Sequence, residues 1–191
     1  MNPSRLLICT SGLPGSGKGV VLQAAERLGL PTFVMGDIVR SETAKQGLEP
    51  TTANTAKIML QYREEYGPHV FAELTAKEIE KSKAAFVLVD GVRSTDELNY
   101  LRSRGWGVVM VAVLSSSDVR FERLSRRGRV DDVRGREEFL ERERREISVG
   151  IDEVILHAEH YLVNEGQSEE EVLAEAEATL REILRGRAGV A

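Results

Sequence analysis

The sequence has little cysteine and no long apolar run, and each shortage excludes a class of protein. Cys9 is the one cysteine among 191 residues, so neither an internal disulfide nor a cysteine zinc site can form. The longest apolar run, residues 108–114, is far shorter than the roughly 20 residues needed to cross a bilayer. We therefore expect a cytoplasmic protein with no membrane partner, whose core needs no disulfide or structural metal.

The chain also has no excess of basic residues. It contains 26 basic and 31 acidic residues and carries a net charge of -5, which disfavours nucleic acid as a partner. Residues 6–9 are apolar but lead directly into a glycine-rich loop, unlike a signal peptide, so we expect the N-terminus to belong to the fold. The proportions of hydrophobic (41%) and charged (30%) residues suit a single globular domain.

The chain does contain an alternation of strand-like and helix-like segments. Short runs of apolar and β-branched residues recur at 6–10, 32–35, 85–89, 108–114 and 161–163. Runs that are apolar at nearly every position are typical of parallel strands that helices cover on both faces. The expected fold class is therefore α/β, with five parallel strands covered by helices.

The segment between the second and third predicted strands is longer than one crossover requires. A helical pattern extends over residues 52–83 and is interrupted at Gly67-Pro68. We interpret residues 47–84 as a small helical insertion. It lies within a single domain that spans residues 1–191.

The strongest motif is a glycine-rich loop directly after the first strand. Residues 12–19 read Gly-Leu-Pro-Gly-Ser-Gly-Lys-Gly, and a helix is expected to open near Lys18. Glycines let backbone N–H groups wrap a phosphate, the helix N-terminus adds a positive dipole end, and Lys18 can reach the β- and γ-phosphates. This pattern predicts a nucleotide-binding P-loop that consists of Gly12, Leu13, Pro14, Gly15, Ser16, Gly17, Lys18, Gly19 and Val20.

One position departs from the usual P-loop. Gly19 stands where a Ser or Thr normally ligates magnesium, so Mg2+ must be held otherwise, through water. The loop resembles that of adenylate kinases and related nucleoside monophosphate kinases, which also lack this hydroxyl. The resemblance implies ATP as the phosphoryl donor, although Val20 replaces the Thr that contacts the α-phosphate in those relatives.

The same resemblance extends to two segments that follow later strands. Residues 36–40 read Gly-Asp-Ile-Val-Arg and resemble the Gly-Asp-x-x-Arg element of adenylate kinases, in which the arginine holds the acceptor phosphate. Residues 90–93 read Asp-Gly-Val-Arg and are similar to that family's Asp-Gly-Phe-Pro-Arg element, one residue shorter. Two guanidinium forks at neighbouring strand ends suit a terminal phosphate dianion. The residues predicted to bind the acceptor are Gly36, Asp37, Arg40 and Arg93.

Carboxylates accompany these arginines. Asp90 stands at the end of an apolar strand, the position of the carboxylate that orders the magnesium shell in P-loop enzymes. By analogy with the resembled family, Asp90 and Asp37 are the candidates to contact Mg2+ through water. Adenylate kinases read the acceptor adenine with a glutamine, but this chain has Glu97 at that spacing. Glu97 forms a helix-capping pattern with Ser94, so we do not extend the recognition of an acceptor adenine from adenylate kinases to this chain.

Arginines are concentrated after the fourth predicted strand. This segment resembles the lid of a short adenylate kinase, and we place the lid at residues 127–137. Lid arginines neutralise charge on the transferring phosphoryl group, and the residues predicted to do so are Arg123, Arg127 and Arg129. Arginines expected instead on solvated helix surface, paired with glutamates, are Arg120, Arg126, Arg144 and Arg145. An RNA-binding patch is disfavoured, because only Phe121 and Phe139 are interspersed and they form no aromatic platform.

The resemblance covers nearly the whole chain. The sequence looks most like the archaeal adenylate-kinase-related P-loop family, whose members are also compared with dephospho-CoA kinase. It implies a sheet ordered 2-3-1-4-5. The predicted function is transfer of the γ-phosphoryl group of ATP onto a small phosphorylated acceptor, with a nucleoside monophosphate as the first candidate. Two alternatives stay open: transfer to a hydroxyl with Asp37 as base, and a nucleotide-gated regulatory ATPase without an acceptor.

Overall fold

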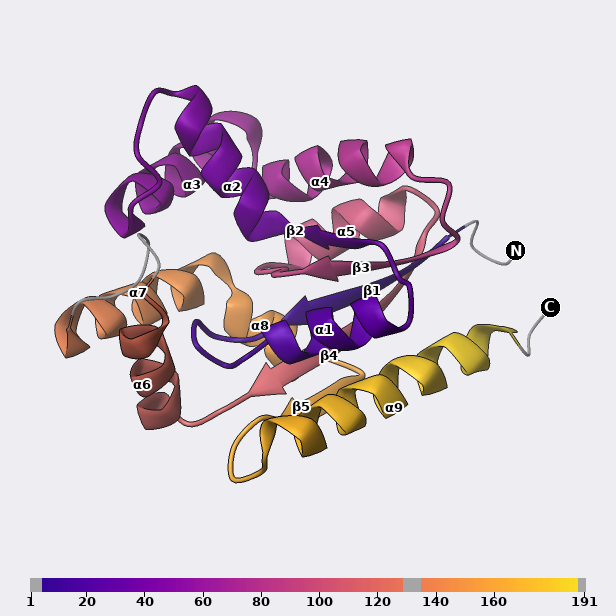
Figure 1. Cartoon of the computed structure of the whole chain (residues 1–191). Helices are drawn as coiled ribbons and strands as arrows, with labels where there is room; N and C mark the ends of the chain where they lie inside the picture. The colour runs from indigo at the N-terminus through magenta and orange to yellow at the C-terminus, as the bar shows by residue number, and fades with distance from the viewer. Residues whose placement is uncertain (1–4, 129–134, 189–191) are drawn as a thin grey trace.

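The computed structural model describes residues 5–128 and 135–188, in which five strands form one sheet (Figure 1). The strands are β1 (Leu6–Ser11), β2 (Thr32–Val34), β3 (Phe86–Asp90), β4 (Gly107–Leu114) and β5 (His160–Val163). Their order is β2-β3-β1-β4-β5, and every neighbouring pair is parallel. Both the α/β class and the predicted strand order are therefore confirmed.

Helices cover both faces of the sheet. They are α1 (Gly19–Arg27), α2 (Met35–Lys45), α3 (Thr52–Tyr66), α4 (Val70–Lys81), α5 (Thr95–Ser103), α6 (Ser117–Arg127), α7 (Arg136–Val149), α8 (Ile151–Leu156) and α9 (Glu169–Ala188). In β1, Leu6 and Ile8 pack with α1 and α9, whereas Leu7 and Cys9 pack with α4 and α5. Because helices bury both faces of β1, these four successive residues are all apolar, rather than every second one. None of the helices in the described ranges is long and apolar enough to cross a membrane.

The chain between β2 and β3 forms three helices, with a break where Gly67-Pro68 predicts one. α3 begins after Thr51, whose side chain accepts a hydrogen bond from the Asn54 N–H at 3.2 Å, and it ends before Gly67 at φ +97°. α4 then returns along the sheet and buries Phe71 in the core. Helices α2 and α3 project beside the sheet as a lobe (Figure 1).

The carboxyl ends of the five strands meet at one edge, between the α2–α3 lobe and helices α6 and α7 (Figure 1). At this edge β1 runs into the glycine-rich loop, β3 ends on Asp90, and β5 leads to Asn164. Ligands of open parallel sheets bind in the crevice at this edge. The fold therefore brings together segments that are more than a hundred residues apart in the chain.

Candidate active site

The glycine-rich loop is tightly wound because three of its glycines adopt positive φ angles: Gly12 (+152°), Gly15 (+84°) and Gly17 (+84°). A Cβ on Gly15 would collide with the backbone carbonyl of Arg120, and a Cβ on Gly17 with the side-chain amide of Asn164. Backbone conformation and the close approach of α6 and of the β5–α9 loop each exclude a side chain here.

Lys18 lies at the N-terminus of α1, with its ammonium turned back over the loop. Its Nζ donates to the carbonyl oxygen of Gly12 at 2.7 Å. Burial lowers the pKa of Lys18, and the nearby Asp90 carboxylate offsets part of that effect. A partly desolvated ammonium beside backbone amides suits phosphate oxygens, because charge attraction is stronger where water is excluded.

Ser16 adds an observation that the motif alone does not provide. Its side chain is 1% exposed, and its Oγ has no hydrogen-bond partner among residues 5–128 and 135–188. The Oγ lies across the loop from Gly12, close enough to exclude a Cβ there. A buried unpaired hydroxyl costs about 1–3 kcal/mol, and a ligand oxygen in the loop would supply its partner. The loop, Lys18 and Ser16 therefore fit the phosphate chain of a nucleotide.

Asp90 is buried at the end of β3 beside the loop. The hydroxyl of Thr10, its register partner on β1, donates to Asp90 Oδ1 at 2.5 Å. No hydrogen bond to the second carboxylate oxygen occurs within the described ranges, and Asp90 borders the same cleft as Lys18. A carboxylate that borders the cleft and has one oxygen fixed by Thr10 is suited to order water around Mg2+.

Asp37 and Arg40 lie in the first turns of α2, across the cleft from the loop. The Arg40 guanidinium forms an ion pair with the Asp37 carboxylate and passes over Gly36, where a Cβ would lie 3.5 Å from Nη1. Asp37 is 65% exposed and borders the cleft. The two predicted Mg2+ contacts therefore differ: Asp90 is buried beside Lys18, whereas Asp37 is exposed and paired with an arginine.

Arg93 follows β3 and is held in place by a carboxylate that the sequence prediction did not include. Its Nε donates to Glu146 Oε2 at 2.8 Å, and its Nη1 donates to the Gly91 carbonyl oxygen at 2.8 Å. Burial would raise the pKa of Glu146, but the charges of Arg93, Arg142 and Lys18 outweigh it and lower the pKa below its ordinary value. Glu146 is therefore an ionised carboxylate on α7 that orients the predicted phosphate clamp.

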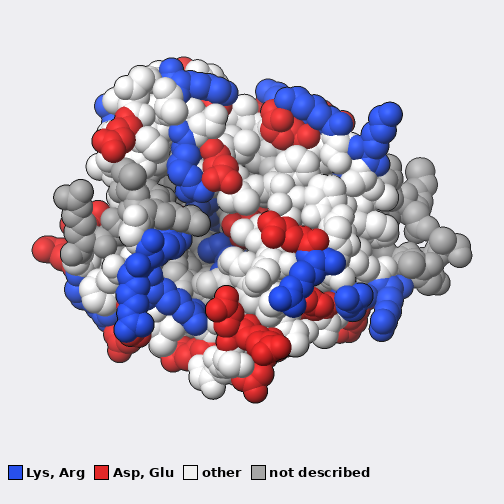
Figure 2. Space-filling view, in the orientation of Figure 1, with Lys and Arg blue, Asp and Glu red and all other residues white. Residues whose placement is uncertain are grey.

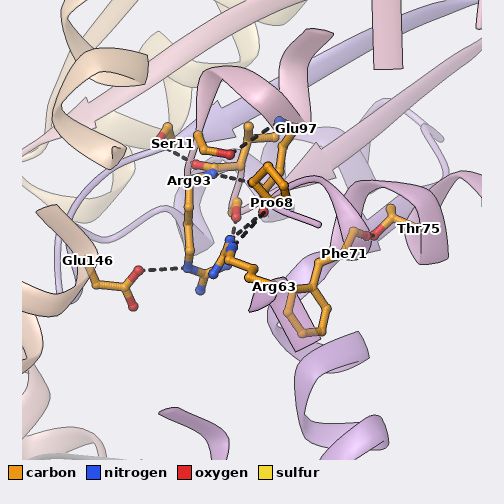
Figure 3. A network of polar contacts seen from close by, with 11 residues as sticks. Ser11, Arg63, Pro68, Phe71, Thr75, Arg93, Glu97 and Glu146 are labelled. Atoms are coloured by element: carbon orange, nitrogen blue, oxygen red, sulfur yellow. Dashed lines mark hydrogen bonds and ion pairs between the residues drawn. The ribbon is translucent and has the colours of Figure 1, made fainter. Parts of the chain in front are cut away.

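A second carboxylate joins Arg93 to the helical lobe (Figure 3). Glu97 is fully buried; its Oε2 accepts from the Arg93 backbone N–H at 2.7 Å, and its Oε1 accepts from Arg63 Nη2 of α3 at 2.5 Å. Ser94 caps α5 through the Glu97 N–H, as predicted, but the Glu97 carboxylate does not complete the expected capping box. One of its oxygens accepts from the Arg93 N–H instead, and the other supplies the counter-charge for the buried Arg63.

The predicted lid arginines occupy different environments. Arg123 is held on α6 by the carbonyl oxygens of Ser16 and Asn164, by Asn164 Oδ1 and by Ser115 Oγ, at 2.9–3.3 Å. Arg127 is exposed at the end of α6 and borders the cleft. Arg129 and residues 129–134 of the predicted lid lie outside the described residues.

Two of the arginines expected on solvated helix surface are placed elsewhere. Arg120 is 4% exposed, pairs with Glu143 at 2.5 Å and packs over the Phe139 ring, because it lies beneath the loop at Gly15. Arg145 is half-buried and borders the groove described below. By contrast, Arg126 is exposed and pairs with Glu122 as expected.

The site has two halves, which we name the donor half and the acceptor groove after the roles that the sequence predicts for them. The donor half is an open cleft of about 1180 Å³, bordered by the loop, by Arg123 and by Asn164 and Gln167 after β5. The acceptor groove continues from it between the α2–α3 lobe and α7, and the charged residues along it are Lys18, Arg40, Asp90, Arg93, Arg127, Arg142, Arg145 and Glu146. Figure 2 shows lysines and arginines gathered around this hollow. Arg40 and Arg93 therefore border one groove, as the sequence analysis expects.

Comparison with known proteins shows the family to which the chain belongs. The family model described as AAA domain matches residues 11–140. A UPF0200 protein of Hyperthermus butylicus is 46% identical over 176 residues, which cover 92% of this chain and 94% of that protein. A UPF0200 protein of Thermococcus onnurineus is 41% identical over 86% of this chain and 91% of its own.

Solved structures share the fold at low sequence identity. TT1252 from Thermus thermophilus superposes with a TM-score of 0.61 and 22% identity, covering 95% of this chain and 98% of its own. Shikimate kinase from Acinetobacter baumannii, in complex with shikimate, gives a TM-score of 0.58 and 19% identity, over 97% and 95% of the two chains. These likenesses show a P-loop kinase fold, whereas the sequence relatives fix the family. The chain belongs to the UPF0200 proteins and carries the P-loop domain of the AAA-domain family that matches it.

Proposed function

We propose that this protein is an ATP- and Mg2+-dependent phosphotransferase that moves the γ-phosphoryl group onto a small phosphorylated acceptor. A nucleoside monophosphate is the first acceptor class, because the chain shares the Gly-Asp-x-x-Arg pattern of nucleoside monophosphate kinases at residues 36–40. The observation that carries the proposal is a pair of arginines, separate from the P-loop, that is placed to hold a second phosphate. Arg40 and Arg93 come from different elements and border one groove that opens onto Lys18 and Asp90.

In this proposal the donor half holds ATP. Backbone amides of residues 12–19 and the Ser16 hydroxyl surround the phosphates, and Lys18 neutralises charge on the group in transfer. Asp90, with Asp37 farther out, would hold Mg2+ through water, and the ion would supply charge neutralisation at the phosphate oxygens. Arg123 braces the loop against Asn164 and keeps the donor half in shape.

The acceptor arginines have the complementary task. Each guanidinium can donate paired hydrogen bonds to a terminal phosphate, which positions an acceptor oxygen for in-line attack. Glu146 fixes the Nε edge of Arg93, so this arginine is pre-oriented before the acceptor arrives. Arg127 and the undescribed Arg129 are proposed to approach the transferring group from the lid side.

Transfer to a hydroxyl is the second candidate within the same chemistry. It needs a carboxylate base near the acceptor oxygen, and Asp37 is the exposed carboxylate at that side of the cleft. A regulatory ATPase without acceptor is the rival from another class. The arginine pair argues against a regulatory ATPase, because hydrolysis of ATP by water involves no acceptor phosphate that Arg40 and Arg93 could bind.

The deciding experiment measures ADP formation and product mass with ATP and Mg2+. Acceptors are AMP, CMP, GMP, UMP, dephospho-CoA and buffer alone. Acceptor-stimulated ADP formation, with a product one phosphoryl group heavier than a nucleoside monophosphate, supports the proposal. A phosphorylated product from dephospho-CoA alone assigns the hydroxyl reaction, and Asp37→Asn should then lower kcat. Equal ADP formation in every sample, including buffer, overturns the kinase assignment.

A further inference from the structure

The acceptor groove extends beyond the two clamp arginines. Its inner end is bordered by Lys18 and Asp90, and its distal end by Thr52, Ala56 and Met59 of the lobe together with Arg145 of α7. Both ends share Gly36, Arg40, Arg93, Arg142 and Glu146, so they form one continuous groove. A bound molecule whose phosphate reached Arg40 and Arg93 would have its remaining atoms directed toward the distal end.

Arg145 places a positive charge at the distal end of the groove. Its side chain is half-buried, and no carboxylate pairs with its guanidinium in the part of the chain that the structure describes. Glu146, the one carboxylate that borders the distal end, already accepts from Arg93. A partly desolvated cation without a partner is costly, and an anion in the groove would remove that cost.

The distal end also contains arginines beyond the two that are predicted to hold the acceptor phosphate. Arg142 and Arg145 border it together with Arg40, which pairs with Asp37, and Arg93, which pairs with Glu146. Arg142 and Arg145 lie three residues apart and therefore on one face of α7, opposite the lobe. Thr52 and Thr55 also border this end, whereas no aromatic ring and no side-chain amide does so among the described residues, so charged groups and hydroxyls are what it offers a ligand.

We propose that the distal end of the acceptor groove binds a second anionic group of the acceptor, a phosphate or a carboxylate, through Arg145 with Arg142. The natural acceptor is then a molecule with two separated anionic groups, one at each end. This inference rests on the proposed function, because it takes the groove to be the acceptor site. It narrows the acceptor class from any phosphorylated compound to bis-anionic ones.

The test compares binding of probe pairs that differ in one anionic group. AMP is paired with adenosine 3′,5′-bisphosphate, and glycerol 3-phosphate with 3-phosphoglycerate, so that the second group is a phosphate in one pair and a carboxylate in the other. Calorimetric titrations contain a saturating non-hydrolysable ATP analogue, which keeps the probes out of the donor half. The proteins are wild type, Arg145→Ala, Arg145→Lys and the matched control Arg144→Ala, whose side chain is exposed on the same helix.

Wild type should bind the bis-anionic member of at least one pair roughly tenfold more tightly, in the range of a charge-assisted hydrogen bond. Arg145→Ala should abolish that preference and leave the mono-anionic member unchanged, Arg145→Lys should keep part of it, and Arg144→Ala should keep all of it. Equal affinities within both pairs, no binding of any probe, or equal losses in the alanine variants at 144 and 145 overturn the inference. A different result contradicts the proposed function: wild type prefers the bis-anionic probe, but no acceptor stimulates ADP formation.

Discussion

The donor half and the acceptor groove are built in different ways from the same chain. The donor half is centred on one local segment, residues 12–19, in which neighbouring residues supply glycine conformations, a buried hydroxyl and an ammonium. The acceptor groove is assembled from α2, α3, the end of β3 and α7, and these elements span residues 35–149. The donor half is therefore recognisable from a local sequence motif, whereas the acceptor groove forms only when distant elements come together in the fold.

The two halves also differ in how their charges are held. Lys18 is turned onto a backbone carbonyl, and Asp90 has the larger effect of the two acidic groups, Asp90 and Glu146, that oppose the lowering of its pKa by burial. Arg93 is fixed through its Nε by Glu146 and through its backbone by Glu97, and Glu97 in turn holds Arg63 of the lobe. The donor half therefore depends on backbone shape, whereas the acceptor groove depends on ion pairs between helices. Substitutions should separate these two dependences.

The largest effect is expected from Lys18→Ala. The variant should fold normally, because the Lys18 ammonium contacts the loop rather than a hydrophobic core. Phosphoryl transfer should fall by roughly a thousandfold or more, the range for loss of a preorganised charge at the transferring group. Circular dichroism and thermal unfolding control for the fold while ADP formation is measured. Wild-type turnover in this variant would remove the P-loop from the mechanism.

Gly15→Ala should damage the donor half through its shape. The new Cβ would collide with the Arg120 backbone carbonyl at a residue with φ +84°, so both conformation and space oppose it. We expect a loss of about 2–4 kcal/mol in the free energy of unfolding, measured in urea, together with weaker ATP binding. Gly186→Ala is the matched control, because a Cβ there meets nothing within 4 Å; it should leave stability unchanged or slightly raised. Equal stabilities would contradict the tight packing of the loop on α6.

Arg93→Ala and Arg40→Ala should weaken use of the acceptor more than binding of ATP, and Arg93→Ala should also lower stability because it leaves the buried Glu146 without its main partner. Each guanidinium supplies a charge-assisted fork worth about 1.5–3 kcal/mol, so kcat/KM for the acceptor should fall roughly ten- to a hundredfold. The dissociation constant of ATP should change little, and basal ATP hydrolysis should persist. Loss of ATP affinity in both variants would place these arginines in the donor half and erase the distinction between the two halves.

Sequence patterns predicted the donor half and the sheet, but only part of the acceptor groove. The P-loop and the apolar strands are local signals, and strand order followed from family resemblance. Glu146, Arg142 and Arg145 were not predicted as site residues, because α7 consists largely of Arg and Glu and resembles an exposed helix at every turn. Only the position of α7 across the groove from the lobe selects which of its faces lines the groove. Arg40 and Arg93 were predicted through the resemblance to adenylate kinase elements, and the fold brings both to one groove.

The smallest effect concerns the Glu146–Arg93 pair and its dependence on pH. The pKa of Glu146 is lower in the folded protein than its ordinary value of 4.5, because Arg93, Arg142 and Lys18 outweigh the effect of burial. Its stabilising contribution is therefore complete above pH 4.5 and is lost as pH falls through the folded pKa. Glu146→Gln keeps an acceptor for Arg93 Nε but loses the charge, so it should cost about 1 kcal/mol near pH 7, the difference between a charged and a neutral hydrogen bond.

That difference between wild type and Glu146→Gln should shrink as the pH falls below 4.5, because the wild-type carboxyl becomes neutral as well. Urea unfolding at pH 7, 5 and 3.5 measures it. In an Arg93→Ala background the same substitution should have a much smaller effect at pH 7, since the main partner of the charge is gone. A cost that stays constant with pH, or that is undiminished without Arg93, would mean that Glu146 packs α7 rather than orienting the clamp. The acceptor groove would then depend on shape, as the donor half does.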